Sequence, residues 1–146
     1  MNTKPVGILL AEDNDDDILM TQKAFKKIRM INELNVVKDG EEAMAYLRRQ
    51  GKYKDAKRPG LVLLDINMPK KDGWAVLEEI KKDPELKSMP VVILTTSQQE
   101  NDVVRSYANG ASSFISKPVV FSQFQELVER FELYWMLVAR VPNPRE

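Results

Sequence analysis

Short apolar runs alternate five times along this chain with longer segments of helical periodicity, and this alternation limits the folds open to it. Continuous apolar runs of this length are typical of strands buried on both faces of a parallel sheet. The candidate strands are residues 6–11, 33–37, 60–65, 90–95 and 112–116, and the candidate helices are 15–29, 41–50, 73–83, 99–109 and 121–140. Five strand–helix units with short connections predict an α/β protein whose parallel sheet has helices on both faces.

Turn residues support the same division of the chain. Asp39-Gly40 and Asp72-Gly73 open the second and third helices, and Gly110 lies where the fourth should stop. The polar stretch Gly51–Pro59 is longer than such connections usually are. We find no internal repeat, so residues 1–146 are most simply one domain, with 121–141 forming an extended last helix.

Composition narrows the classes of function. Lys plus Arg and Asp plus Glu number 22 each, so no global field attracts nucleic acid or anionic membrane. No apolar run approaches the ~20 residues of a membrane span, and we expect a cytoplasmic protein with no membrane partner. The chain has no Cys and no His, which excludes thiolate metal sites and makes triad hydrolysis improbable. A phosphoryl group handled here must therefore arrive from another molecule.

Carboxylates stand where two of the candidate strands end. Glu12-Asp13 follow the first apolar run, and Asp65 ends the third. The carboxyl ends of parallel strands meet at one edge of a sheet, where ligands bind. Because Mg²⁺ prefers oxygen ligands, we expect Asp13 and Asp65 to bind it directly, Glu12 to act through water, and the Asn67 carbonyl to complete the set. The competing interpretation, that these acids are turn residues or helix caps, explains one of them more easily than all three.

Two further strand ends carry side chains that suit an anion. Lys117-Pro118 follows the fifth apolar run, and its ammonium can neutralise a phosphate oxygen. Thr95 and Thr96 end the fourth run, where a hydroxyl can bond a phosphoryl oxygen. Each signal is weak by itself, since most lysines are solvated surface charges and Thr is a good strand former.

Taken together, these residues resemble the signature of the receiver domain of bacterial response regulators, over nearly the whole chain. The residues that carry the resemblance are Glu12-Asp13, Asp65-Ile66-Asn67-Met68-Pro69, Asp72-Gly73, Leu94-Thr95 and Lys117-Pro118. The resemblance implies a flavodoxin-like, doubly wound sheet of order 2-1-3-4-5 with five helices. It implies a two-component phosphorelay in which Asp65 accepts a phosphoryl group from a sensor histidine kinase, with Mg²⁺ at Asp13, Asp65 and Asn67. It also implies that Thr95 and Lys117 contact the phosphoryl group and that Phe114 is the aromatic switch residue, which is often Tyr in relatives.

A narrower resemblance concerns the partner. The Gly51–Pro59 loop, the run Leu94-Thr95-Thr96-Ser97 and the aromatic tail with Trp135 and Pro142 resemble single-domain regulators paired with bacterial phytochrome kinases. No helix-turn-helix pattern follows the fifth helix, so we expect output through protein contact and no binding of nucleic acid.

The apolar pattern of the last helix predicts a homodimer. Its apolar seam recurs at spacings of three and four residues through Phe121, Phe124, Val128, Phe131, Trp135 and Val138. Its second half is apolar nearly all round, whereas one sheet can cover only one side of a helix. We therefore expect a dimer interface that includes Phe131, Trp135 and Val138, with the kinase as the other candidate occupant of this surface.

Three other classes of protein share parts of this pattern. A flavodoxin-like redox carrier needs a phosphate loop of Gly and hydroxyl residues after the first strand, whereas residues 12–17 are almost all acidic. A Mg²⁺-dependent phosphohydrolase typically has Asp-x-Asp, whereas Asn67 follows Asp65 at that spacing. A receiver-like docking module would not need an intact site. The pattern favours a phosphoacceptor signalling protein that is no enzyme beyond its own phosphotransfer and autodephosphorylation.

Overall fold

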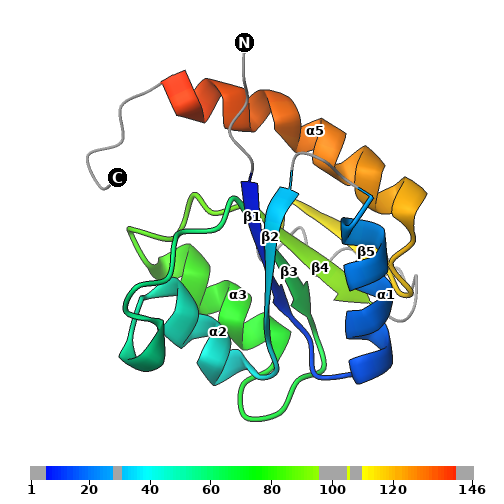
Figure 1. The fold of residues 1–146 in the computed structure, drawn as a ribbon. Helices are drawn as coiled ribbons and strands as arrows, with labels where there is room; N and C mark the ends of the chain where they lie inside the picture. Colours follow the sequence, from blue (N-terminus) through cyan, green and yellow to red (C-terminus); the bar gives the residue numbers. More distant parts are fainter. Residues whose placement is uncertain (1–5, 28–30, 96–104, 106–109, 141–146) are drawn as a thin grey trace.

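A computed structural model describes residues 6–27, 31–95, 105 and 110–140 of the chain (Figure 1). Five parallel strands form one sheet in the order β2-β1-β3-β4-β5, which confirms the predicted topology. The strands are β1 Val6–Ala11, β2 Ile31–Val37, β3 Leu61–Asp65, β4 Val91–Thr95 and β5 Ser113–Ser116.

Helices cover both faces of the sheet. Helices α1 (Asp15–Phe25) and α5 (Phe121–Arg140) lie on one face, and α2 (Gly40–Leu47) and α3 (Gly73–Lys82) lie on the other (Figure 1). The described residues therefore form four α helices rather than the five predicted. The helix predicted over 99–109 lies outside the described residues except for Arg105, which is helical, so that helix stays a prediction.

Two predicted helix ends are wrong, each for a local reason. The first helix stops at Phe25 rather than at residue 29, because the Lys27 N–H donates to the Ala24 carbonyl, three residues back, and the backbone leaves the α-helical pattern in a turn. The second stops at Leu47 rather than at residue 50, because Arg49 adopts a left-handed backbone with φ 56°. A short 3₁₀ helix, η1 (Gly51–Tyr53), then interrupts the stretch that the sequence predicts to be an irregular loop.

Strand alternation sorts the buried side chains into two cores. Successive residues of a strand point to opposite faces, so Leu9 and Val62 pack towards α2 and α3 while Leu10 and Leu63 pack towards α1 and α5. The same period places Asp65 in line with Leu63, on the α1 and α5 side of the sheet. The alternation that sorts the core side chains thus also decides on which face of the sheet each charged side chain at a strand end lies.

Helix caps place the helices directly behind the carboxyl edge of the sheet. Asn14 caps α1 by accepting from the Asp17 N–H, Asp39 caps α2 and Asp72 caps α3 in the same manner. The prediction that Asp39-Gly40 and Asp72-Gly73 open these two helices is therefore confirmed. Asp13 and Asp65 cap no helix in the part of the chain that is described, and they are left for another role.

Candidate functional site

Three carboxylates meet at the carboxyl edge of the sheet. One oxygen each of Glu12, Asp13 and Asp65 lie within 4.8 Å of one another. Adjacent pairing of β1 and β3 brings them together, since Ala11 is in register with Leu64 and the acids follow directly. Glu12 and Asp65 are only 0% and 2% exposed, whereas Asp13 is exposed. The group is therefore closed on the side of the sheet and open to solvent at Asp13.

Lys117 reaches into this group from the end of β5. Its Nζ lies 3.0 Å from Glu12 Oε1 and 3.2 Å from Asp65 Oδ1, and its side chain is 8% exposed. Its backbone N–H donates to the Thr95 carbonyl at 2.7 Å, and the peptide bond to Pro118 is cis. The predicted convergence of acids and lysine from three separate strand ends is thus present in the structure.

Asp17 is a fourth carboxylate at the site, and sequence reasoning missed it. Its Oδ2 lies 3.1 Å from Lys117 Nζ. Its backbone N–H, in the first turn of α1, donates to the side chain of the N-cap residue Asn14. The signal that could have found it is helical spacing. Asp17 lies four residues before Thr21 and seven before Ala24, both buried, so it shares their face of the helix.

The charges of the site do not balance. One ammonium, that of Lys117, faces the carboxylates of Glu12, Asp65 and Asp17, with Asp13 beside them. Burial raises the pKa of Glu12 to about 7, although the hydrogen bond from Lys117 acts in the opposite direction. Burial alone would lower the pKa of Lys117, but its bonds to Glu12 and Asp17 outweigh this and hold the pKa above its ordinary value. The site keeps a charged lysine and an excess of carboxylate that a divalent cation would offset.

The other predicted residues of the switch lie on the opposite face of the sheet. Thr95 is buried at the end of β4, and Phe114 on β5 is half-buried against the core under α2 and α3. In the pairing of β4 with β5, Ile93 is opposite Phe114 and Thr95 is opposite Ser116. Thr95 and Phe114 are therefore near neighbours on one face, whereas Lys117 reaches the acids on the other.

The loop after Asp65 carries Asn67, which is exposed. Two glycines, Gly40 at the start of α2 and Gly73 at the start of α3, let other backbone pass closely beside this loop. A Cβ on Gly40 would lie 2.1 Å from the Lys71 carbonyl oxygen, and a Cβ on Gly73 would lie 2.3 Å from that of Asp65. The Gly73 N–H also donates to the Ile66 carbonyl at 2.8 Å. The loop is thus pinned to the start of α2 and of α3, but no described contact brings the Asn67 carbonyl to the acids.

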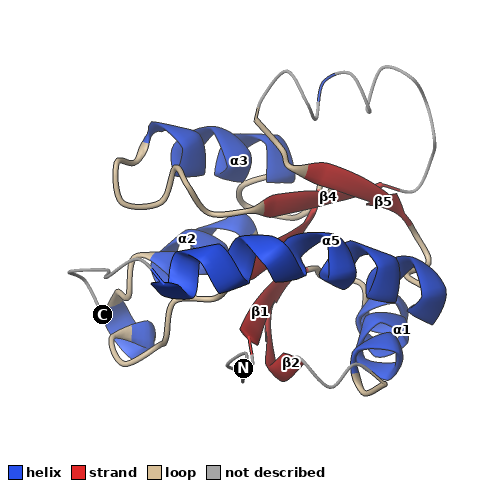
Figure 2. Ribbon diagram, turned by 90° about the horizontal axis from the view of Figure 1, so that it is seen from above, coloured by secondary structure: helices blue, strands red, loops and turns tan. Residues whose placement is uncertain are grey.

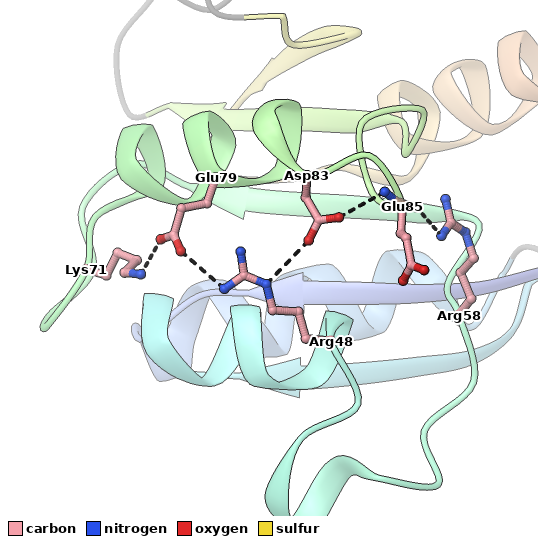
Figure 3. Close-up of polar contacts among 6 residues, drawn as sticks. All are labelled: Arg48, Arg58, Lys71, Glu79, Asp83 and Glu85. Carbon is pink, nitrogen blue, oxygen red and sulfur yellow. Dashed lines mark hydrogen bonds and ion pairs between the residues drawn. The ribbon is translucent and has the colours of Figure 1, made fainter.

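A network of ion pairs at the surface connects the same loop to α2 and α3. Lys71 pairs with Glu79 of α3, which Arg48 at the end of α2 approaches at 3.3 Å, as Figure 3 shows. Arg48 also reaches Asp83 at 3.5 Å, and Asp83 accepts from the Glu85 N–H. These ion-pair side chains are 21–35% exposed, so each pair contributes only modestly to stability. Because the pairs connect α2, α3 and the loop, their main effect is to orient these three segments relative to one another.

The predicted dimer residues lie in the second half of α5. The helix continues as predicted to Arg140. It begins beside α1, and its C-terminal end extends past the sheet on the side away from α1 (Figures 1 and 2). The side chains of Phe131, Trp135 and Val138 are outside the described part of the structure, so their interface stays a prediction. Among the described residues, no helix has both the length and the apolar character that a membrane span requires.

Comparison with known proteins identifies the class. The family model described as response regulator receiver domain matches residues 8–131. Response regulator Rcp1 of Synechocystis is 41% identical over 138 residues, which cover 94% of this chain and 94% of Rcp1. The phosphorylated cyanobacterial phytochrome response regulator RcpA is 45% identical with a TM-score of 0.77, over 95% of this chain and 99% of RcpA. The Mn²⁺-bound form of Rcp1 has a TM-score of 0.74 at 41% identity, over 95% of this chain and all 100% of that one.

The chain belongs to the response regulator receiver domain family. It is a phosphoacceptor signalling protein of a two-component system, and its group of Glu12, Asp13 and Asp65 is the acidic metal site typical of receivers.

Proposed function

We propose that Asp65 is the phosphoacceptor and that the chain works as a single-domain regulator whose phosphorylation changes its protein contacts. The observation that supports this most is the position of Asp65, buried beside Glu12 and Asp13 and paired with Lys117. In the transfer, a carboxylate oxygen of Asp65 forms the new P–O bond. The P–N bond of a phosphohistidine breaks, and its electron pair stays on the imidazole nitrogen. Lys117 can follow the phosphoryl oxygens because it is already held within 3.2 Å of Asp65.

The metal is proposed to be Mg²⁺. Asp13 and Asp65 would bind it directly, Glu12 through water, and the carbonyl of Asn67 would complete the set. The donor chemistry fits, because all side-chain ligands are carboxylate oxygens gathered within 4.8 Å, and one relative has been solved with Mn²⁺, an ion of similar preference. When bound, the ion would offset negative charge on the transferring phosphoryl group.

The switch is proposed to run through Thr95 and Phe114. A phosphoryl group on Asp65 adds charge and acceptor oxygens, and the Thr95 hydroxyl can move towards them from the neighbouring strand. Phe114 then fills the space that Thr95 leaves. The surface around β5 changes shape as a result, which is a two-state response to a local charge.

The phosphoryl donor is proposed to be a sensor histidine kinase of the bacterial phytochrome type. The support is that similar solved structures are those of phytochrome or bacteriophytochrome response regulators. Because the sequence contains no His, the phosphohistidine must belong to the partner.

Phosphorylation of Asp65 can be tested by mass spectrometry after incubation with acetyl phosphate and Mg²⁺. Wild-type protein should gain one phosphoryl group, and Asp65→Asn should gain none and should bind beryllofluoride, a phosphoryl mimic, far more weakly. Asp16→Asn removes the same charge from an exposed position nearby and is the matched control. An undiminished mass gain in Asp65→Asn would refute the assignment.

The homodimer through α5 can be tested separately by light scattering at micromolar concentration. The support is the apolar second half of the helix, which includes Phe131, Trp135 and Val138. A double variant, Trp135→Glu with Leu137→Glu, should be monomeric, whereas Gln123→Glu on the exposed side of the first half should not change the mass. A wild-type monomer, with and without beryllofluoride, would contradict the proposal.

A further inference from the structure

Ser116, the last residue of β5, carries a hydroxyl that the site so far described does not use. Its oxygen exposes less than 1 Å², and within the described part of the structure it has no hydrogen-bond partner. It is the one buried side-chain polar atom in that state among the described residues. Buried hydroxyls are nearly always bonded, because leaving one without a partner costs free energy. The position therefore calls for an explanation.

The neighbour of Ser116 across the sheet is Thr95. The two residues are opposite each other in the parallel pairing of β4 with β5. Alternation along the strands puts both on the face that holds Ile93 and Phe114, the side of α2 and α3. Adjacent strands lie about 4.8 Å apart, so paired Thr and Ser side chains on one face are within reach of each other. Ser116 is thus a hydroxyl held next to the hydroxyl proposed to follow the phosphoryl group.

The chemistry of a hydroxyl suggests what the pair can do. A threonine oxygen carries one proton to donate and two lone pairs that accept. If Thr95 donates its proton to a phosphoryl oxygen, its own oxygen can still accept a hydrogen bond. The Ser116 O–H is the neighbouring donor, and chains of such bonds polarise and strengthen each other.

We propose that Ser116 is a positioning residue for the phosphorylated state, in which its hydroxyl donates to Thr95 while Thr95 donates to the phosphoryl group. The inference rests on the proposed function of Asp65 and Thr95. In the unphosphorylated state the Ser116 hydroxyl is an uncompensated polar group, and in the phosphorylated state it gains a partner. The residue therefore disfavours the first state and favours the second, which biases the switch towards the response.

Beryllofluoride binding in the presence of Mg²⁺, followed by calorimetry, tests this bias. Ser116→Ala should bind beryllofluoride about threefold to tenfold more weakly than wild type, the loss expected for one neutral hydrogen bond. The same variant without beryllofluoride should melt no lower than wild type, because it removes an unsatisfied group. Ser116→Thr keeps a hydroxyl and should restore most of the affinity. Ser113→Ala deletes the same atom from a buried serine on the opposite face of β5 and is the matched control.

A Thr95→Val background separates the proposed contact from an independent effect of Ser116. There, Ser116→Ala should weaken beryllofluoride binding no further, because the partner hydroxyl is already gone. Wild-type affinity in Ser116→Ala, or an equal loss in both backgrounds, would overturn the inference while leaving the function of Asp65 intact. Failure of the wild-type protein to bind beryllofluoride would instead overturn the proposed function, and this inference with it.

Discussion

Glu12 combines complete burial with two hydrogen bonds that favour its charged form. Its Oε1 accepts from Lys117 at 3.0 Å, and its Oε2 accepts from the Asn14 N–H at 3.2 Å. Burial still prevails and raises its pKa to about 7, with the negative charge of Asp65 adding to the effect. Without a metal ion, Glu12 is therefore a carboxyl group that titrates near neutral pH, deep in a folded protein.

This residue gives the metal-free protein a pH-dependent stability. In the unfolded chain the Glu12 carboxyl titrates near 4.5, whereas in the folded protein its pKa is about 7. The folded state binds this proton more tightly, so the contribution of Glu12 to stability is fully present below pH 4.5 and is lost as the pH rises through 7. We expect the free energy of unfolding, measured with urea in EDTA, to fall between about pH 5 and about pH 7.5.

The variant Glu12→Gln should flatten this part of the pH profile, because its amide does not titrate. Glu41→Gln changes an exposed glutamate on α2 and should leave the profile as in wild type. A profile in Glu12→Gln as steep as that of wild type would assign the titration to another group.

The site residues differ in how well the sequence could predict them. Glu12, Asp65 and Lys117 were predictable because each ends an apolar run, and parallel strands bring their ends together. Asp17 was missed because Asp15, Asp16 and Asp17 are adjacent and identical in kind. The feature that distinguishes it is its helical spacing from Thr21 and Ala24, which places it on the buried side of α1, towards Lys117.

At the scale of elements, the close approach between α2 and the loop after β3 positions the loop. No side chain fits at Gly40, since its Cβ would lie 2.1 Å from the Lys71 carbonyl oxygen, which is backbone and cannot rotate away. Gly40→Ala should therefore lower the free energy of unfolding by about 1–3 kcal/mol through overpacking. It should also weaken Mg²⁺ binding by about tenfold in calorimetry, because the displaced loop carries Asn67.

Gly7→Ala is the matched control for this prediction. Nothing lies within 4 Å of the position that its Cβ would take, so stability should change by less than about 1 kcal/mol and Mg²⁺ binding not at all. Unchanged Mg²⁺ affinity in Gly40→Ala would show that the loop holds its place without this contact.

Element boundaries were harder to predict than the elements themselves. Asp39 and Asp72 mark the starts of α2 and α3 because a cap is a local bond, read from a few residues. The end of α2 depends instead on Arg49 taking a left-handed backbone, which Gly usually does. The 3₁₀ helix that follows is held by packing of the Tyr53 ring against that of Tyr46, with the ring centroids 5.2 Å apart. Because this contact is not local in the sequence, no local pattern predicted the 3₁₀ helix.

For the whole molecule, the two-sided arrangement of helices was predictable from the apolar runs, whereas the sheet order was predicted from the resemblance to receiver domains. Strands such as Leu61–Asp65 and Val91–Thr95 are buried at every position, so their apolar runs could only belong inside a sheet covered on both faces. The same arrangement leaves the carboxyl edge as the one place where Glu12, Asp65 and Lys117 converge. Fold and site were predictable together because one topology produces both.

Mg²⁺ should stabilise the whole fold, because the acids at this edge are brought together only in the folded state. An ion that binds the native state alone stabilises by about 1.4 kcal/mol at a tenfold excess over its dissociation constant. For a chain of this length that is an increase in melting temperature of roughly 3–6 °C. Asp13→Asn should melt higher than wild type in EDTA, because it removes repulsion from Glu12 and Asp65, and should respond less to Mg²⁺. Asp16→Asn, exposed and outside the group, should respond as wild type does. A wild-type melting temperature that Mg²⁺ leaves unchanged would count against a metal site at this edge.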